Sequence, residues 1–182
     1  GEVLSDAQFA QLRLSKQRHY LDEVRSGAVV LRPGVARLLR ELQAQEIDQW
    51  IVTSSGGPSV SALLDTLFPG GDHPFAGVIS SDDVSRHKPS PDPYWKALER
   101  SHSDPDTALA LEDSTPGLLS ACTAGLRCLL MPSPWDQELH RHQDQAVAVL
   151  DHLGSAQLPC CVSSGPPCLD GLVTLEYLQM LL

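Results

Sequence analysis

Short apolar runs that end in polar residues alternate with amphipathic helical patterns along this chain, and this alternation constrains the fold most. Residues 50–52 form one run, which ends in the letters TSS and precedes a helical stripe at residues 60, 63, 64 and 67. Residues 75–79 form a second run, which ends in SSDD and precedes a helix expected to begin near Asp92. Strands and helices that alternate at this spacing predict βαβ units and a mostly parallel sheet between two helical layers.

The same pattern continues through the second half of the chain. Further strands are expected at 107–111, 127–131 and 146–150, and further helices at 116–124 and 136–143. Gly, Pro, Ser and Cys dominate residues 154–171, which predicts a loop before a terminal helix at 172–182. The sequence thus predicts an α/β class with a Rossmann-like three-layer core over residues 31–153 and an appendage at 154–182. A preceding helix at 6–25 has four candidate buried positions, Phe9, Leu12, Tyr20 and Val24.

Charge and cysteine content narrow the class of protein. The net charge of −10 argues against a general nucleic-acid binder. No apolar run approaches the ~18 residues that a membrane-spanning helix needs. Five cysteines without a CxxC pair suit reduced thiols in the cytoplasm, and no zinc site is expected in the segment CCVSSGPPC at 160–168. The basic side chains between residues 13 and 40 are expected to be surface groups on a solvated helix face, and the alternative is a positive wall that faces an anionic ligand.

Polar side chains follow two of the predicted strands at the same edge of the sheet. Thr53 and Ser54 follow the run at 50–52, and Glu112 and Asp113 follow the run at 107–111. Lys88 lies in the loop SRHKPSPDPY before the helix at Asp92. Each of these residues has a structural alternative, as a helix cap or a solvated charge. Together they suit a phosphate site, in which hydroxyls and an ammonium bind phosphate oxygens and carboxylates hold Mg²⁺.

The order of IVTSSGGPSVSALL, KPSPDPY and LALEDSTPG resembles motifs two, three and four of the haloacid dehalogenase-like hydrolase superfamily. Within it, the chain is most similar to the CbbY-type phosphatases and the β-phosphoglucomutases, over residues 8–152. The resemblance implies that Thr53 binds the transferring phosphoryl group, with Ser54 as a second donor, and that Lys88 stabilises the nucleophile. It also implies that Asp113 binds Mg²⁺, that Glu112 is a ligand or its partner, and that Ser114 bonds around the metal shell.

The chain departs from the family at the first motif, DxDGT or DxDGV, which supplies the nucleophilic aspartate. No such segment occurs here. Residues 1–30 instead resemble the end of a helical cap, so we expect an N-terminally truncated chain that has little phosphatase activity alone. In this interpretation Lys16 lies on the cap side and binds the distal part of the substrate.

The leading hypothesis is a Mg²⁺-dependent phosphatase that hydrolyses a small phosphorylated sugar through an aspartyl phosphate. A β-phosphoglucomutase-like phosphoryl transfer is the alternative within the enzymes. A non-catalytic regulatory protein that binds phosphate and Mg²⁺ is the alternative outside them. We expect a cytoplasmic monomer with no nucleic-acid or membrane partner. The sequence assigns no role to Cys160, Cys161 and Cys168.

Overall fold

The computed structural model describes residues 5–182, although within the first helix it describes only some of the side chains. The chain divides into two compact units, the first formed by residues 1–31 and 55–73 and the second by residues 32–54 and 74–182. No helix among the described residues is long and apolar enough to cross a membrane.

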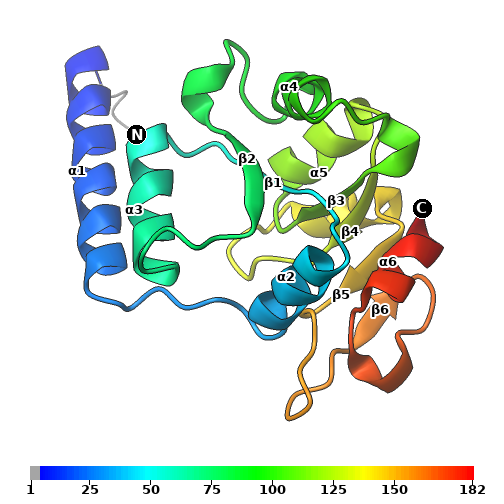
Figure 1. The fold of residues 1–182 in the computed structure, drawn as a ribbon. Helices are drawn as coiled ribbons and strands as arrows, with labels where there is room; N and C mark the ends of the chain where they lie inside the picture. Colours follow the sequence, from blue (N-terminus) through cyan, green and yellow to red (C-terminus); the bar gives the residue numbers. More distant parts are fainter. Residues whose placement is uncertain (1–4) are drawn as a thin grey trace. The chain divides into compact units, whose positions relative to one another are not determined.

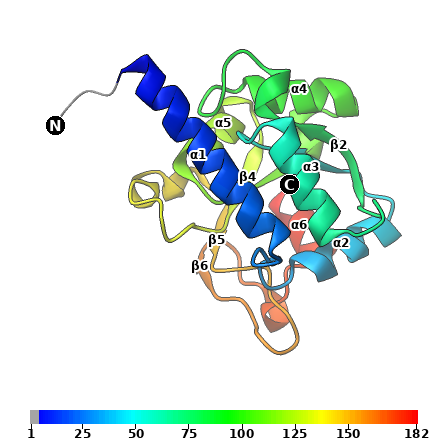
Figure 2. The same cartoon turned by 90° about the vertical axis from the view of Figure 1, so that its left-hand side faces the viewer.

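Two helices form the described part of the first unit, and they lie side by side in both views (Figures 1 and 2). Helix α1 (Asp6–Arg25) matches the predicted span, and Ser5 caps it by accepting a hydrogen bond from the backbone N–H of Gln8. Helix α3 spans Gly57–Leu67. Val24 is fully buried as expected, whereas Leu12 is 56% exposed, so its prediction as a core residue was wrong. The side chain of Phe9 lies outside the described part of α1.

The second unit is the α/β part, and its strands form two sheets. Strands β1 (Gln49–Val52) and β2 (Phe75–Ile79) pair in parallel. Strands β3 (Leu109–Glu112), β4 (Arg127–Leu130) and β5 (Ala148–Leu150) form a second parallel set, which β6 (Val162–Ser164) extends in the antiparallel direction (Figure 1). The predicted α/β class with a mostly parallel sheet is confirmed.

Four helices accompany these strands: α2 (Val35–Ala44), α4 (Asp92–Ser101), α5 (Thr115–Thr123) and α6 (Leu175–Leu181). Leu38 of α2 and Leu178 of α6 pack with Leu129 and Leu150 in one apolar cluster. A second cluster contains Tyr94 of α4, Leu118 of α5 and strand residues such as Leu130. Burial of these side chains is the main force that fixes the helices against the strands.

Two predictions in the second half of the chain were wrong. The helix expected at 136–143 is replaced by two short 3₁₀ turns, Leu139–Arg141 and Gln143–Gln145. The loop expected at 154–171 contains β6, where the Ser163 hydroxyl donates to the Val149 carbonyl of β5 over 3.1 Å. A three-residue edge strand takes most of its stability from its partner, which explains why local composition did not indicate it.

Two of the arginines that we expected to be surface groups also bind backbone carbonyls; Arg32 is exposed as expected, whereas Arg37 is half-buried. Arg32 donates to the carbonyls of Met131 and Asp151 over 2.8 and 2.6 Å. Arg37 donates to the carbonyls of Leu153 and Val173 over 3.0 and 2.6 Å. These hydrogen bonds attach the start of α2 to the segments that follow β4 and β5 and to the segment that precedes α6.

Glycines allow the same two segments to approach closely. A Cβ on Gly34, at the N-cap of α2, would lie 2.3 Å from the carbonyl oxygen of Gly154. Gly34 also has a φ of 86°, a conformation that other L-residues rarely adopt. The RPG segment, which we interpreted only as a chain break before a helix, is thus also a docking point for residues 153–154.

Candidate active site

Lys88 connects the carboxyl ends of two strands that belong to different sheets. Its ammonium donates to the carbonyl oxygen of Val52, the last residue of β1, over 2.9 Å. The same ammonium forms an ion pair with Glu112, the last residue of β3. The two side chains are only 8% and 7% exposed. A buried pair is tolerated when hydrogen bonds satisfy its remaining atoms, and the Val52 carbonyl serves that purpose here.

Tyr94 completes the surroundings of this ion pair. Its hydroxyl donates to the same Glu112 oxygen that binds Lys88. Its ring lies below the ammonium, with 5.0 Å between Nζ and the ring centroid. Burial, followed by the charge of Glu112, raises the pKa of the Tyr94 hydroxyl well above its ordinary value. The tyrosine therefore keeps its proton near neutral pH and remains a donor to the carboxylate.

Helix α5 begins directly beside Glu112 and makes room for it. A Cβ on Gly117 would lie 1.8 Å from Oε2 of Glu112, so a larger residue at this position would displace the carboxylate. Ser114 caps the helix by accepting a hydrogen bond from the Gly117 N–H over 3.3 Å. Burial, followed by Glu112, also raises the pKa of the nearby Cys128 thiol, which stays protonated.

Asp113 has the opposite environment from its neighbour. Its side chain is exposed, and it lines an open cavity of about 670 Å³ with Thr115, Trp135 and Asp136. Asp136 accepts a hydrogen bond from the Thr115 N–H over 2.5 Å and a second one, over 3.1 Å, from the Thr115 hydroxyl. These bonds, with the backbone bond first, lower the pKa of the Asp136 carboxyl.

The remaining predicted residues have the following places. Thr53 lies at the carboxyl end of β1, where its N–H donates to the Ile79 carbonyl over 2.9 Å, and Ser54 follows it as an exposed residue. The second unit thus brings Thr53, Ser54, Lys88, Glu112 and Asp113 to one edge of its strands. Lys16 lies in α1 of the first unit, and its side chain is outside the described residues.

Sequence reasoning missed three residues at this edge: Tyr94, Gly117 and Asp136. Tyr94 lies on the buried face of α4 and is 6% exposed. A buried tyrosine usually has a partner for its hydroxyl, and this rule was the available signal. No local pattern indicates Asp136, because its partner Thr115 is 21 residues away in the chain.

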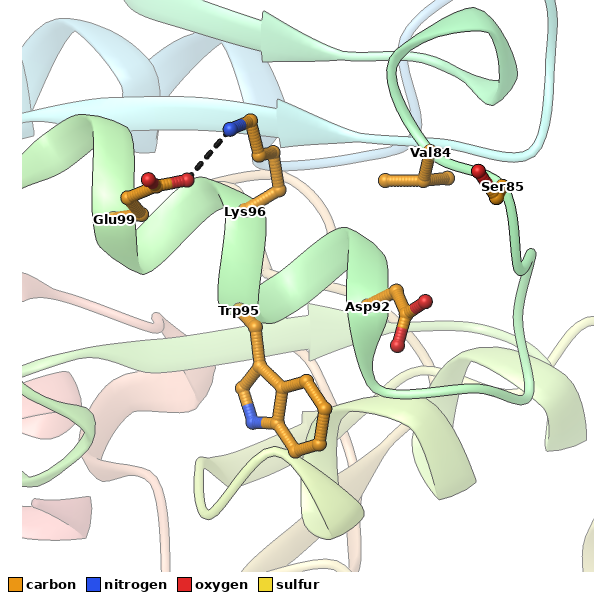
Figure 3. A pocket seen from close by; sticks show the side chains of 6 residues that line it. All are labelled: Val84, Ser85, Asp92, Trp95, Lys96 and Glu99. Atoms are coloured by element: carbon orange, nitrogen blue, oxygen red, sulfur yellow. Dashed lines mark hydrogen bonds and ion pairs between the residues drawn. The ribbon is translucent and has the colours of Figure 1, made fainter.

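Two other places in the second unit do not contribute to this edge. Asp104 and Asp106 have the spacing of the first motif's aspartates, but they lie in and beside the turn Pro105–Thr107, before the amino end of β3. A cavity of about 400 Å³ along α4 contains no predicted site residue. Figure 3 shows Lys96 and Glu99 pointing toward each other there, and Trp95 pointing away from them.

Comparisons with known proteins show which family the chain resembles. Residues 4–131 match the family model described as haloacid dehalogenase-like hydrolase. The CbbY protein of Rhodobacter capsulatus is 40% identical over 137 residues, which are 74% of this chain and 60% of that protein. Validoxylamine A 7'-phosphate phosphatase of Streptomyces hygroscopicus subsp. limoneus is 33% identical over 111 residues, which are 61% of this chain and 51% of that protein.

Solved structures of CbbY and of β-phosphoglucomutase have a fold similar to that of this chain. A crystal structure of mutant CbbY from Rhodobacter sphaeroides, in complex with xylulose-(1,5)bisphosphate, superposes with a TM-score of 0.75 at 31% identity. The match covers 85% of this chain and 68% of that one. β-Phosphoglucomutase from Clostridium difficile shares the fold at a TM-score of 0.71 and 15% identity, over 98% of this chain and 68% of that one. This chain spans about 60% of the length of the curated CbbY relatives. It belongs to the haloacid dehalogenase-like hydrolase family.

Proposed function

We propose that the edge formed by Thr53, Lys88 and Asp113 is the phosphate-binding half of a CbbY-like phosphatase that acts on a small phosphorylated sugar. The observation that carries this proposal is the position of Lys88, whose buried ammonium joins the carboxyl ends of β1 and β3. A fixed positive charge at this edge favours a bound phosphate, and ligands of open α/β sheets bind outside the carboxyl ends of the strands.

Of the two carboxylates at this edge, only one is available to bind Mg²⁺. Among the described residues, no group of three or more His, Cys, Asp or Glu side chains could hold a metal ion. Mg²⁺ often takes only one or two protein carboxylates and completes its shell with water and substrate phosphate. Asp113 is exposed and suits this role, whereas the Glu112 carboxylate is engaged by Lys88 and Tyr94. We therefore assign Asp113 as the metal ligand and Glu112 as the residue that holds Lys88.

The residues of this chain would divide the work as follows. Thr53 and Ser54 would donate to phosphate oxygens, and Lys88 would offset the charge that builds up as a carboxylate attacks phosphorus. The bound metal ion would reduce the repulsion between nucleophile and phosphate. Asp104 and Asp106 lie before the amino end of β3, so neither is placed to serve as the nucleophile of the proposed aspartyl phosphate. The five free cysteines support a reducing, cytoplasmic location.

A chimaera tests the function in an active context. Residues 32–131 of this chain would replace the matching segment of R. capsulatus CbbY, and hydrolysis of xylulose-1,5-bisphosphate would be measured with Mg²⁺ present. We expect activity in the chimaera, and losses of about 100-fold or more in its Asp113→Asn variant. A folded chimaera without activity, or an Asp113→Asn variant as active as its parent, would contradict the proposal. Binding of Mg²⁺ and inorganic phosphate without activity would favour the regulatory alternative.

A further inference from the structure

Three cysteines lie in the segment between β5 and α6, a part of the second unit that the proposed active site does not use (Figure 1). All three are free thiols. Cys160 is buried at 8% exposure, Cys168 is half-buried and Cys161 is exposed. A dissolved reagent therefore reaches the three thiols to different extents, and their contacts decide which of them can react with each other.

The backbones of Cys160 and Cys168 are both bonded to Gly171. The Cys160 N–H donates to the Gly171 carbonyl over 2.8 Å, and the Gly171 N–H donates to the Cys168 carbonyl over 3.2 Å. A Cβ on Gly171 would lie 2.5 Å from the Cβ of Pro159, so a glycine is needed for this close approach. Cys168 packs against the apolar cluster that contains Cys160, and the two thiols are close enough to share a hydrogen bond. The fold thus brings these two sulfur atoms together.

The loop between the two cysteines is held in place on both sides. Residues 162–164 form β6, which pairs with β5. Tyr177 of α6 is 6% exposed, and its hydroxyl donates to the Pro166 carbonyl over 2.9 Å. Burial, followed by the nearby Cys168 and Cys160, raises the pKa of this tyrosine, so it keeps its proton and remains a donor. A loop fixed in this way loses little further conformational freedom when a covalent bond joins its ends.

Cys161 has a different environment from its neighbour Cys160. Its backbone N–H donates to the Asp151 carboxylate over 2.9 Å, and its side chain is exposed. The Cα atoms of adjacent residues lie about 3.8 Å apart, which is less than the ~4.4–6.8 Å that a disulfide usually spans. A disulfide between Cys160 and Cys161 would therefore be strained, which leaves Cys168 as the partner of Cys160.

We propose that Cys160 and Cys168 are a redox-active thiol pair, which closes reversibly to a disulfide by exchange with a low-molecular-weight disulfide such as oxidised glutathione. Closure covalently joins the segment after β5 to the turn before α6. The pair is a modification site outside the proposed active site, and the inference does not depend on the proposed catalytic function.

The exchange takes place in two steps. Burial, followed by the hydrogen bond to Cys168, raises the pKa of the Cys160 thiol, so Cys168, which solvent reaches, reacts first. Its thiolate attacks one sulfur of oxidised glutathione, a mixed disulfide forms, the glutathione S–S bond breaks, and one glutathione thiolate leaves. Cys160 then loses its proton to water, and its Sγ attacks the Sγ of Cys168 and expels the second glutathione thiolate. The protein loses two electrons and two protons, and one oxidised glutathione becomes two reduced molecules.

Oxidation of the full chain in mixtures of oxidised and reduced glutathione tests the pair. Trypsin cleaves after Arg141 and releases residues 142–182, which contain these three cysteines and no Lys or Arg. Mass spectrometry of this fragment after alkylation separates the closed disulfide, which lacks two hydrogen atoms, from glutathione adducts. We expect the closed form to exceed the adduct at Cys168 by at least about tenfold, because the second thiol is already in place. An adduct that persists without closure would overturn the proposal, as would the absence of any reaction.

Cysteine variants identify the partners. Cys161→Ser is the matched control and should close as the parent does, whereas Cys168→Ser and Cys160→Ala should each close at least about tenfold less. Cys168 is half-buried, so Cys168→Ser tests the pair even where Cys160→Ala fails to fold. Loss of closure in Cys161→Ser, or closure retained in Cys168→Ser, would overturn the assignment.

A comparison with the unfolded chain shows whether the fold, rather than the short loop, pairs the two cysteines. In the Cys161→Ser variant, the equilibrium constant for closure should be at least about tenfold larger in buffer than in concentrated urea, because a disulfide that fits the fold stabilises it. Equal constants in the two solvents would overturn the proposal.

Discussion

Replacement of Lys88 by Met should destabilise the protein far more than replacement of an ordinary surface lysine. The substitution keeps most of the side-chain volume but removes the ammonium, and it leaves Glu112 buried at 7% exposure. Loss of one partner from a buried ion pair costs about 3–5 kcal/mol. Tyr94 still donates to the carboxylate, so we expect the lower end, about 3 kcal/mol. A chain of this size loses about 2–4 °C of melting temperature per kcal/mol, which predicts a decrease of about 6–12 °C.

A double-mutant cycle isolates the pair from other effects. Urea unfolding followed by tryptophan fluorescence would be measured for Lys88→Met, Glu112→Gln and the double variant. The double variant should be more stable than the sum of the single losses predicts, by at least about 1.5 kcal/mol, because it leaves no unpaired charge. Lys96→Met is the matched control, since Lys96 pairs with an exposed Glu99 and should cost less than about 1 kcal/mol. Equal losses for the two lysine variants, or strictly additive losses in the cycle, would refute the buried pair.

Three other predictions follow from the same contacts. Gly117→Ala should cost more than about 2 kcal/mol in urea unfolding, because the new methyl group displaces Glu112; a neutral effect would show that the carboxylate can move freely. Arg37→Ala should cost about 2–3 kcal/mol through its lost carbonyl bonds, whereas the exposed Arg40→Ala should change stability by less than about 0.5 kcal/mol; similar values for both would contradict the fastening of α2. Asp136→Asn should lower stability by less than about 1 kcal/mol at pH 7. The folded-state pKa of Asp136 lies below its ordinary value of 3.8, so its contribution is complete above that value and disappears as pH falls through the folded pKa. A difference between the two proteins that does not become smaller as the pH falls below 3.8 would contradict the charged cap on Thr115.

The sequence predicted the elements that a local run of residues specifies. Strand β2 and helix α1 have the predicted bounds, and β1, β3 and β4 differ from theirs by one or two residues. Alternation of elements also placed Thr53 and Asp113 at a common edge, because parallel strands share their direction. Features that depend on distant partners could not be predicted in this way. The Arg32 and Arg37 bonds span about a hundred residues or more, and β6 forms only because β5 offers an edge.

The two acids at the end of β3 show, within the site, which features the local sequence could predict and which depend on distant partners. Consecutive residues at a strand end point to opposite faces, so Glu112 and Asp113 cannot share one environment. Glu112 turns inward, where Gly117 makes room and Lys88 and Tyr94 compensate its charge. Asp113 turns outward to an open cavity and remains exposed to solvent. Two adjacent carboxylates would repel each other if they shared one environment. Here Lys88 and Tyr94 compensate the charge of Glu112, and solvent reaches Asp113. Charge removal should therefore affect mainly folding at position 112 and mainly metal and phosphate binding at position 113.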